Sequence, residues 1–209
     1  DEIKAAWEGS EDLRKMGVFY NWAAAVNMGD GDGEYANPGD IDYREVEGSR
    51  GGPTGNVKGI CPAGWHLPSD AEWNDLEGEI ALSAAGVYSS IGPTPWPDDN
   101  GTNLRTTAGY RGAHGEKMKH PLVEYPEEPY GASKPAEEGG FSTYPVGYVN
   151  GGNSYSFFRT ADFWSSSSGE TKWETVRAWM RYLYLGSETV TRNTEGRGRL
   201  LSVRCKKNN

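Results

Sequence analysis

A period-two alternation near the carboxyl end most constrains the fold of this 209-residue chain. Over residues 175–184, small and apolar residues (Val176, Ala178 and Met180) alternate with a second set that includes Trp179 and Arg181. Successive side chains of a β-strand point to opposite faces, whereas a helix repeats every 3.6 residues. The segment is therefore predicted to form a strand.

The flanking sequence predicts that this strand belongs to a β-rich carboxyl-terminal third. Residues 185–187 (LGS) form a turn signal before ETVTRN, so we expect a hairpin here. Upstream, the aromatic runs YPVGYV, SYSFF and DFWSSS are separated by GGN and RTA, which is typical of short antiparallel strands. We expect RLLSVRC to form the last strand and GVFYNWAAAV to be a strand end that runs into a helix.

One helix start is clearly marked in the first half of the chain. Ser69 and Glu72 have the spacing of a capping box, in which each side chain accepts a hydrogen bond from the other residue's amide. Trp73, Leu76 and Ile80 then recur at helical spacing and predict one packed face. We expect the helix to end by residue 86, with the polar side chains of Asp70, Asn74, Asp75 and Glu77 pointing away from the core.

The remaining chain is dominated by irregular tracts. Residues 27–59, 91–106 and 112–140 are rich in Gly, Pro, Asp or Glu, which favour turns over regular pairing. Long loops within compact domains are often functional. We interpret residues 1–15 as an amino-terminal arm and residues 16–209 as one domain, a length sufficient for a single core.

Composition narrows the classes of partner. Only 35% of residues are apolar, yet the chain has 8 Trp, and we expect a compact aromatic core containing Trp22, Trp65, Trp73 and Trp164. The net charge of −9 opposes binding to nucleic acid or to anionic membranes. No run approaches the roughly 20 apolar residues of a membrane-spanning helix. Because the chain begins at Asp1, we expect a targeting segment to precede it.

Several separated motifs, taken in order, resemble one protein family. GVFYNWAAAVN, CPAGWHLPSDAEWNDLE, GGFSTYPVGYVNGG, FWSSSS and SVRCKK are similar to the Fibrobacter succinogenes major paralogous domain. Members of that family are mostly secreted or lipid-anchored surface proteins (lipoproteins) of Bacteroidetes and Fibrobacter. LPSDAEW also resembles a helix start of formylglycine-generating enzymes. The resemblance implies an α+β, C-type-lectin-like fold with two helices, a twisted antiparallel sheet and long loops.

The same resemblance bears on the two cysteines and on location. In a lectin-like domain the last strand runs beside the elements that carry the early helix, which implies a disulfide between Cys61 and Cys205. The alternative is a pair of buried thiols in a reducing compartment. The family also implies an extracellular or outer-membrane, surface-anchored location.

No common catalytic motif is present in the sequence. GxSxG, HExxH and GxxxxGK are all absent. The three histidines are scattered, and we interpret His66 as a hydrogen-bonded structural residue. Formylglycine generation needs two reactive cysteines, whereas both cysteines here are expected to serve the scaffold. We therefore expect a non-enzymatic protein that uses no cofactor.

Two calcium signals are weak. Trp73, Asn74 and Asp75 spell the WND triplet of calcium-dependent lectins, but they lie inside the predicted helix and the companion EPN or QPD triplet is missing. A second, acidic stretch alternates carboxylates with glycines, yet its register lacks the closing glutamate of an EF-hand, so we favour a solvated loop. The weak metal candidates in that stretch are Asp30, Asp32 and Glu34.

The candidate ligand contacts lie on the late hairpin and on two loops. If Val176, Ala178 and Met180 face the core, the opposite face of the hairpin presents Trp and Arg, a combination found at protein interfaces and sugar-stacking sites. The equally weighted alternative is that Trp179 packs beneath a long loop and that its arginine neighbours pair with acidic residues of the loops. The full candidate set is Trp96, Trp173, Arg177, Trp179, Arg181 and Arg192.

The sequence therefore predicts a non-catalytic binding or adhesion module that recognises a glycan or a host or bacterial surface protein through loops and the late hairpin. Two other functions remain open at this point. The domain could be a glycan-active enzyme, since its 30 carboxylates include potential acid–base pairs. It could also be a structural surface protein that binds no small ligand.

Overall fold

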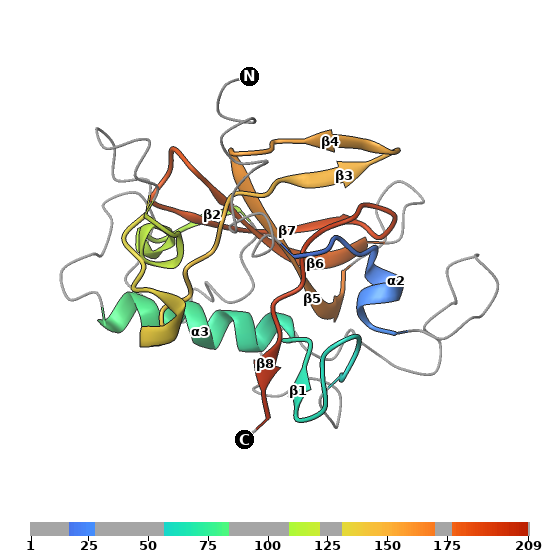
Figure 1. Cartoon of the computed structure of the whole chain (residues 1–209), viewed down its shortest axis with the longest axis horizontal. Coiled ribbons are helices and arrows are strands. Elements are labelled where there is room, and N and C mark those ends of the chain that lie inside the picture. Colours follow the sequence, from blue (N-terminus) through green and yellow to red (C-terminus); the bar gives the residue numbers. More distant parts are fainter. Residues whose placement is uncertain (1–16, 28–56, 84–108, 122–130, 170–176, 209) are drawn as a thin grey trace.

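The structure, a computed structural model, describes residues 17–27, 57–83, 109–121, 131–169 and 177–208. These residues form an α+β arrangement with few helices and several antiparallel sheets (Figure 1). In the described part of the chain, two α-helices and two 3-10 helices lie among short strands. In chain order the elements are α2 (Trp22–Ala25), β1 (Trp65–His66), α3 (Asp70–Ser83), β2 (Gly109–Arg111), η2 (His114–Met118), η3 (Ala136–Glu138), β3 (Tyr148–Asn150), β4 (Asn153–Tyr155), β5 (Thr160–Ser168), β6 (Arg177–Tyr184), β7 (Val190–Gly196) and β8 (Lys206–Lys207).

The central sheet has four antiparallel strands in the order β2-β7-β6-β5. The predicted hairpin is confirmed as β6 and β7, whose register places Arg181 opposite Arg192. Strand β5 pairs with the other side of β6, and this ladder shifts register between Trp164 and Ser168. Such an irregularity increases local twist and bends the strand.

Helix α3 lies along one side of this sheet (Figure 1). The predicted capping box is confirmed: the Ser69 amide donates to Glu72 Oε2 over 2.9 Å, and the Glu72 amide donates to Ser69 Oγ over 3.2 Å. The Asp70 amide also donates to Ser167 Oγ of β5 over 2.9 Å. The start of the helix is therefore fixed both locally and against the sheet.

Both faces of the sheet are covered, which explains why a chain with few apolar residues can bury so many aromatic ones. On one face, Trp164 and Met180 pack with Trp22 of α2 and with Cys61. The opposite face contributes a second cluster, which is packed against α3 and η2 and contains Trp73, Met118, Ala161, Phe163, Leu183 and Val190. Adjacent strand residues thus enter different cores.

The early and late parts of the chain are joined below the sheet. Strand β1 pairs antiparallel with β8. The disulfide between Cys61 and Cys205 is confirmed, with Cα atoms 5.9 Å apart and 144 residues between the two positions. His66 is hydrogen-bonded as predicted: its Nδ1 and Nε2 atoms lie 2.6 Å from Asn208 Oδ1 and 2.9 Å from Glu72 Oε1, and the side chain is buried.

Two structural predictions need correction. Trp65 is 39% exposed because it lies on the two-residue strand β1, whose only pairing is to β8, whereas Trp22, Trp73 and Trp164 are buried as expected. The RLLSVRC segment is not one strand. Its residues Leu200, Leu201 and Ser202 each bridge a different partner, and the regular pairing comes later, at β8.

The proposed arm, residues 1–15, lies outside the described residues. In the described part of the chain, no helix combines the length and apolar character that crossing a bilayer requires.

Candidate ligand pocket

Five of the sequence-predicted residues cannot be placed. Trp96 and Trp173 lie outside the described residues, as do the weak metal candidates Asp30, Asp32 and Glu34. The described residues contain no group of three or more His, Cys, Asp or Glu side chains that could hold a metal ion.

Two arginines of the hairpin, Arg181 and Arg192, are buried in a network of charges beneath α3. Arg181 donates to Asp70 Oδ1 and Glu77 Oε1, each over 2.6 Å, and to Asn74 Oδ1 over 2.8 Å. Arg192 donates from Nη2 to Asp70 Oδ2 over 2.7 Å. All of these side chains are at most 1% exposed. Buried charges of this kind need close partners, and here every guanidinium has them.

The prediction of an exposed Trp–Arg face is therefore wrong. Trp179 is only 7% exposed, and the Arg192 guanidinium lies 3.4 Å from the centre of its ring. The alternative is right that the arginines pair with carboxylates, but wrong that these come from a loop, because Asp70 and Glu77 belong to α3. Arg177 is half-buried and donates from Nε to Thr194 Oγ1 over 3.0 Å.

The helix prediction missed the same network because helical periodicity locates faces without showing what packs on them. Asp70, Asn74 and Glu77 were expected to point away from the core, yet they are at most 1% exposed. Their spacing of three and four residues places them on one side of α3, toward the sheet. The alternation in β6 likewise separates two faces, and both turn out to be covered.

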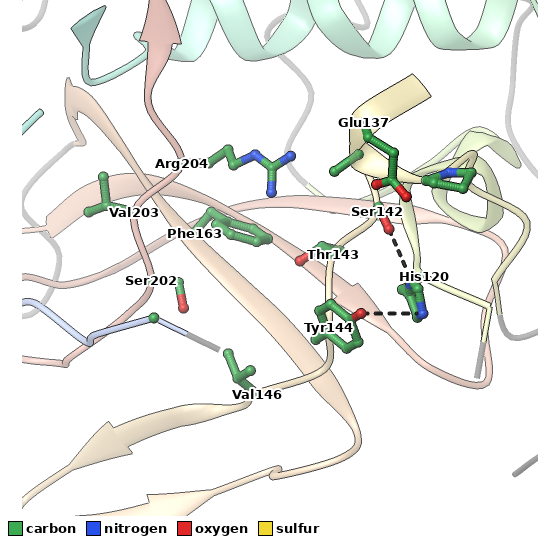
Figure 2. A pocket seen from close by; sticks show the side chains of 13 residues that line it. His120, Glu137, Ser142, Thr143, Tyr144, Val146, Phe163, Ser202, Val203 and Arg204 are labelled. Atoms are coloured by element: carbon green, nitrogen blue, oxygen red, sulfur yellow. Dashed lines mark hydrogen bonds between the residues drawn. The ribbon is translucent and has the colours of Figure 1, made fainter. Parts of the chain in front are cut away.

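A different part of the molecule is open to a ligand. A pocket of about 490 Å³ lies beside β5, within the size range of small-molecule sites (Figure 2). Its walls come from segments far apart in the sequence. The lining residues are His120, residues 135–137 at the start of η3, residues 142–144 and 146, Phe163 of β5, residues 202–204, and Gly17.

One wall of the pocket is a histidine held between two hydroxyl groups. His120 Nδ1 lies 2.8 Å from Ser142 Oγ, and the Tyr144 hydroxyl lies 3.3 Å from His120 Nε2. The His120 and Tyr144 rings are stacked, with centroids 4.4 Å apart. Figure 2 shows these three side chains together at one end of the pocket. They present a flat ring surface and polar atoms side by side.

Backbone pairing keeps this wall in place. The Thr143 amide donates to Met118 O over 3.0 Å, and the His120 amide donates to Thr143 O over 2.9 Å. Ser142 has a positive φ of 46°, and its amide donates to the Ser133 hydroxyl over 2.8 Å. The side chains of the wall therefore project from a backbone that is paired on both sides.

The opposite part of the pocket carries an arginine without a carboxylate partner. Arg204 donates from Nη2 to Phe141 O over 2.7 Å, and its guanidinium lies 4.6 Å from the centre of the Phe141 ring. Within the described residues it forms no ion pair. Burial lowers the pKa of Arg204. In Figure 2 its side chain extends into the pocket between Phe163 and Glu137.

One residue of the lining also has a buried polar atom without a partner among the described residues. Ser202 lines the pocket and is 6% exposed, and its hydroxyl has no hydrogen-bond partner in the described part of the chain. Most buried polar atoms in proteins are paired, so each exception needs a reason.

Sequence reasoning missed all of these pocket residues. Arg204 lies in SVRC, which was interpreted as strand and disulfide. His120 lies in the tract 112–140, which was interpreted as loop, and Tyr144 begins a run that was interpreted as strand. His120 is more than 20 residues from Ser142 and Tyr144 in the sequence, so no local spacing could have united the three. The one available signal was a single arginine amid small and apolar residues before the last cysteine.

Comparison with known proteins shows the family to which this chain belongs. The chain has an α+β domain fold closed by one disulfide, with a polar and aromatic pocket on it. The Fibrobacter succinogenes major domain matches residues 3–207, and the chain therefore belongs to that family. No curated protein and no solved structure shows a significant match to it.

Proposed function

We propose that this protein is a non-catalytic binding module, secreted or anchored at the cell surface, that recognises a glycan through the pocket around His120 and Arg204. The observation that carries the proposal is the lining of the pocket: a stacked His120–Tyr144 pair, several hydroxyl groups and an arginine converge on one open space of about 490 Å³. Flat rings and fixed hydrogen-bonding groups together are what sugar recognition requires.

The fold and location in this proposal rest on further features. A C-type-lectin-like fold is supported by the long helix on an antiparallel sheet and by the late chain segment that returns beside β1. An extracellular location is supported by the disulfide, since such bonds persist in oxidising compartments. The module is expected to present the pocket to a glycan partner, with a surface protein as the other possible partner.

A glycan array tests the proposed function. The whole chain, with its disulfide intact, is applied beside the variants Tyr144→Ala and Tyr155→Ala. The first removes part of the pocket wall, whereas Tyr155 is 43% exposed on β4 and does not line the pocket. We expect binding to a restricted set of glycans that is lost in Tyr144→Ala and kept in Tyr155→Ala. Absence of any glycan signal, or loss only in Tyr155→Ala, would contradict the proposal.

One contact favours a second candidate, a glycan-active enzyme. The 2.8 Å distance between Ser142 Oγ and His120 Nδ1 is that of a serine and its general base. A glycan esterase built on this pair would hydrolyse acetylated oligosaccharides, and the activity would disappear in Ser142→Ala. We rank this candidate second because Ser142 is 8% exposed and already serves the wall described above. Turnover of an acetylated glycan by the native protein would establish it.

A further inference from the structure

We propose that the pocket selects an acidic sugar and that Arg204 binds its carboxylate. This inference rests on the proposed glycan-binding function and adds the chemical class of the ligand. The starting observation is that Arg204 is the arginine of the pocket lining and that it bonds to a backbone carbonyl and forms no ion pair among the described residues.

The buried arginines elsewhere in the fold provide the contrast. Arg181 and Arg192 are each held by carboxylates of α3, with nitrogen–oxygen distances of 2.6–2.7 Å. Among the described residues, the hydrogen-bond partner of Arg204 is the Phe141 carbonyl, although a guanidinium carries five N–H donors. A half-buried cation with unused donors, facing open space, is suited to an anion that arrives with the ligand.

The planar shape of the Arg204 guanidinium indicates which class of anion it can bind. A planar guanidinium can form two parallel hydrogen bonds with the two oxygens of a carboxylate. One unpaired positive charge matches a single negative charge. Glu137, on the pocket rim opposite Arg204 in Figure 2, and the net charge of −9 both oppose a more highly charged ligand. We therefore favour a uronic or sialic acid over a phosphorylated sugar.

The rest of the lining fits the remainder of such a sugar. The His120–Tyr144 stack offers a ring face and polar atoms, and the Glu137 carboxylate can accept hydrogen bonds from sugar hydroxyls. Ser202 also lines the pocket, although its hydroxyl is itself buried. Phe163 supplies an apolar surface between these groups.

Calorimetric titration of the whole chain tests this inference. The probes are trisaccharides of galacturonate, glucuronate, mannuronate and guluronate together with sialyllactose, each compared with its methyl ester, which keeps the ring and removes the charge. A sulfated trisaccharide and an acidic peptide serve as other anions. We expect at least one acidic sugar to bind about 10–100-fold more tightly than its ester, the range for a hydrogen-bonded charge.

The variants identify the residue responsible. Arg204→Gln should abolish the preference for the acid over the ester, and Arg204→Lys should weaken acid binding about tenfold because it keeps the charge but not the planar fork. Arg199→Gln is the matched control, since Arg199 pairs with Glu195 over 2.9 Å outside the pocket, and it should change affinity less than about twofold. Melting temperatures check that each variant is folded.

The other outcomes separate the two proposals. Equal binding of acids and esters, unchanged in Arg204→Gln, would overturn the role of Arg204 and leave glycan binding standing. Preference for the sulfated sugar or the peptide would overturn the assignment to sugar acids. If no sugar of any kind binds, both this inference and the proposed function are contradicted.

Discussion

Asp70 is the residue on which the charged layer under α3 depends. Burial by itself would raise its pKa, but Arg181 and Arg192, through their charges and hydrogen bonds, hold the pKa of Asp70 below its ordinary value of 3.8. A carboxyl group whose pKa is lower in the folded state stabilises the fold above the unfolded pKa. That contribution is lost as the pH falls below about 4 toward the folded value. Asp70 therefore contributes to stability throughout the neutral range.

Replacing Arg181 tests this layer. Arg181→Met leaves Glu77 and Asp70 buried with one cation fewer, so we expect the free energy of unfolding to fall by about 3–5 kcal/mol, measured by urea denaturation with the disulfide intact. Arg199→Met is the control, because its pair with Glu195 is partly exposed and should be worth less than about 1 kcal/mol. Equal losses in the two variants would contradict the importance assigned to the layer.

Asp162 shows the opposite electrostatic situation. It is 5% exposed in β5, and burial raises its pKa to about 6, although the Thr160 hydroxyl donates to its carboxylate. The folded state therefore holds this proton more tightly than the unfolded chain does. The contribution of Asp162 to stability falls as the pH rises from about 4 to 6 and stays low above that window.

Asp162→Asn should accordingly stabilise the protein at neutral pH. The amide avoids the burial of a charge and can still accept a hydrogen bond from Thr160, so the free energy of unfolding should rise by about 1–3 kcal/mol at pH 7. The advantage should disappear below about pH 4, where the wild-type carboxyl group is protonated in both states. Denaturation curves at several pH values measure it, and a variant less stable than wild type at pH 7 would refute this account.

At the scale of elements, the path from the pocket wall into the β3–β4 hairpin passes through Gly147. Its φ is +72°, and a Cβ atom there would lie 2.2 Å from the Tyr155 carbonyl oxygen. The Gly147 amide donates to Thr160 O over 2.6 Å, which ties the segment to β5. Only glycine meets both conditions at this position.

Gly147→Ala should therefore cost about 3 kcal/mol or more in the free energy of unfolding. The control is Gly139→Ala, which has a similar φ of +82° but nothing within 4 Å of the added Cβ, and which should cost about 1–2 kcal/mol for backbone strain alone. Thermal melts of the two variants compare them directly. Similar losses would mean that the close approach to Tyr155 is relieved by a small movement.

Elements with local signals were predictable from the sequence. The capping box of Ser69 and Glu72 and the alternation in β6 each encode their structure within a few residues, and both predictions were confirmed. What covers each face is not local information. Asp70 and Glu77 resemble solvent-facing residues on a helix until Arg181 and Arg192 are brought beneath them by a strand pairing more than a hundred residues away.

At the scale of the whole molecule, the fold brings together groups that the sequence keeps apart. The disulfide was foreseen only through the family resemblance, since spacing alone does not define a pairing, and it links positions 144 residues apart. The pocket was not foreseen, because His120, Tyr144 and Arg204 belong to three segments without a shared motif. The sequence thus indicated the class of protein, whereas the location of a site required the tertiary arrangement.

The central claim is that this pocket is the binding site, and mapping by amide chemical shifts tests it most directly. An acidic trisaccharide identified by calorimetry is added to the ¹⁵N-labelled chain. The account predicts that the largest shifts cluster at residues 142–146 and 202–204 and at His120, around the pocket of Figure 2. Shifts confined to the β3–β4 hairpin, or to residues outside the described part of the chain, would contradict it.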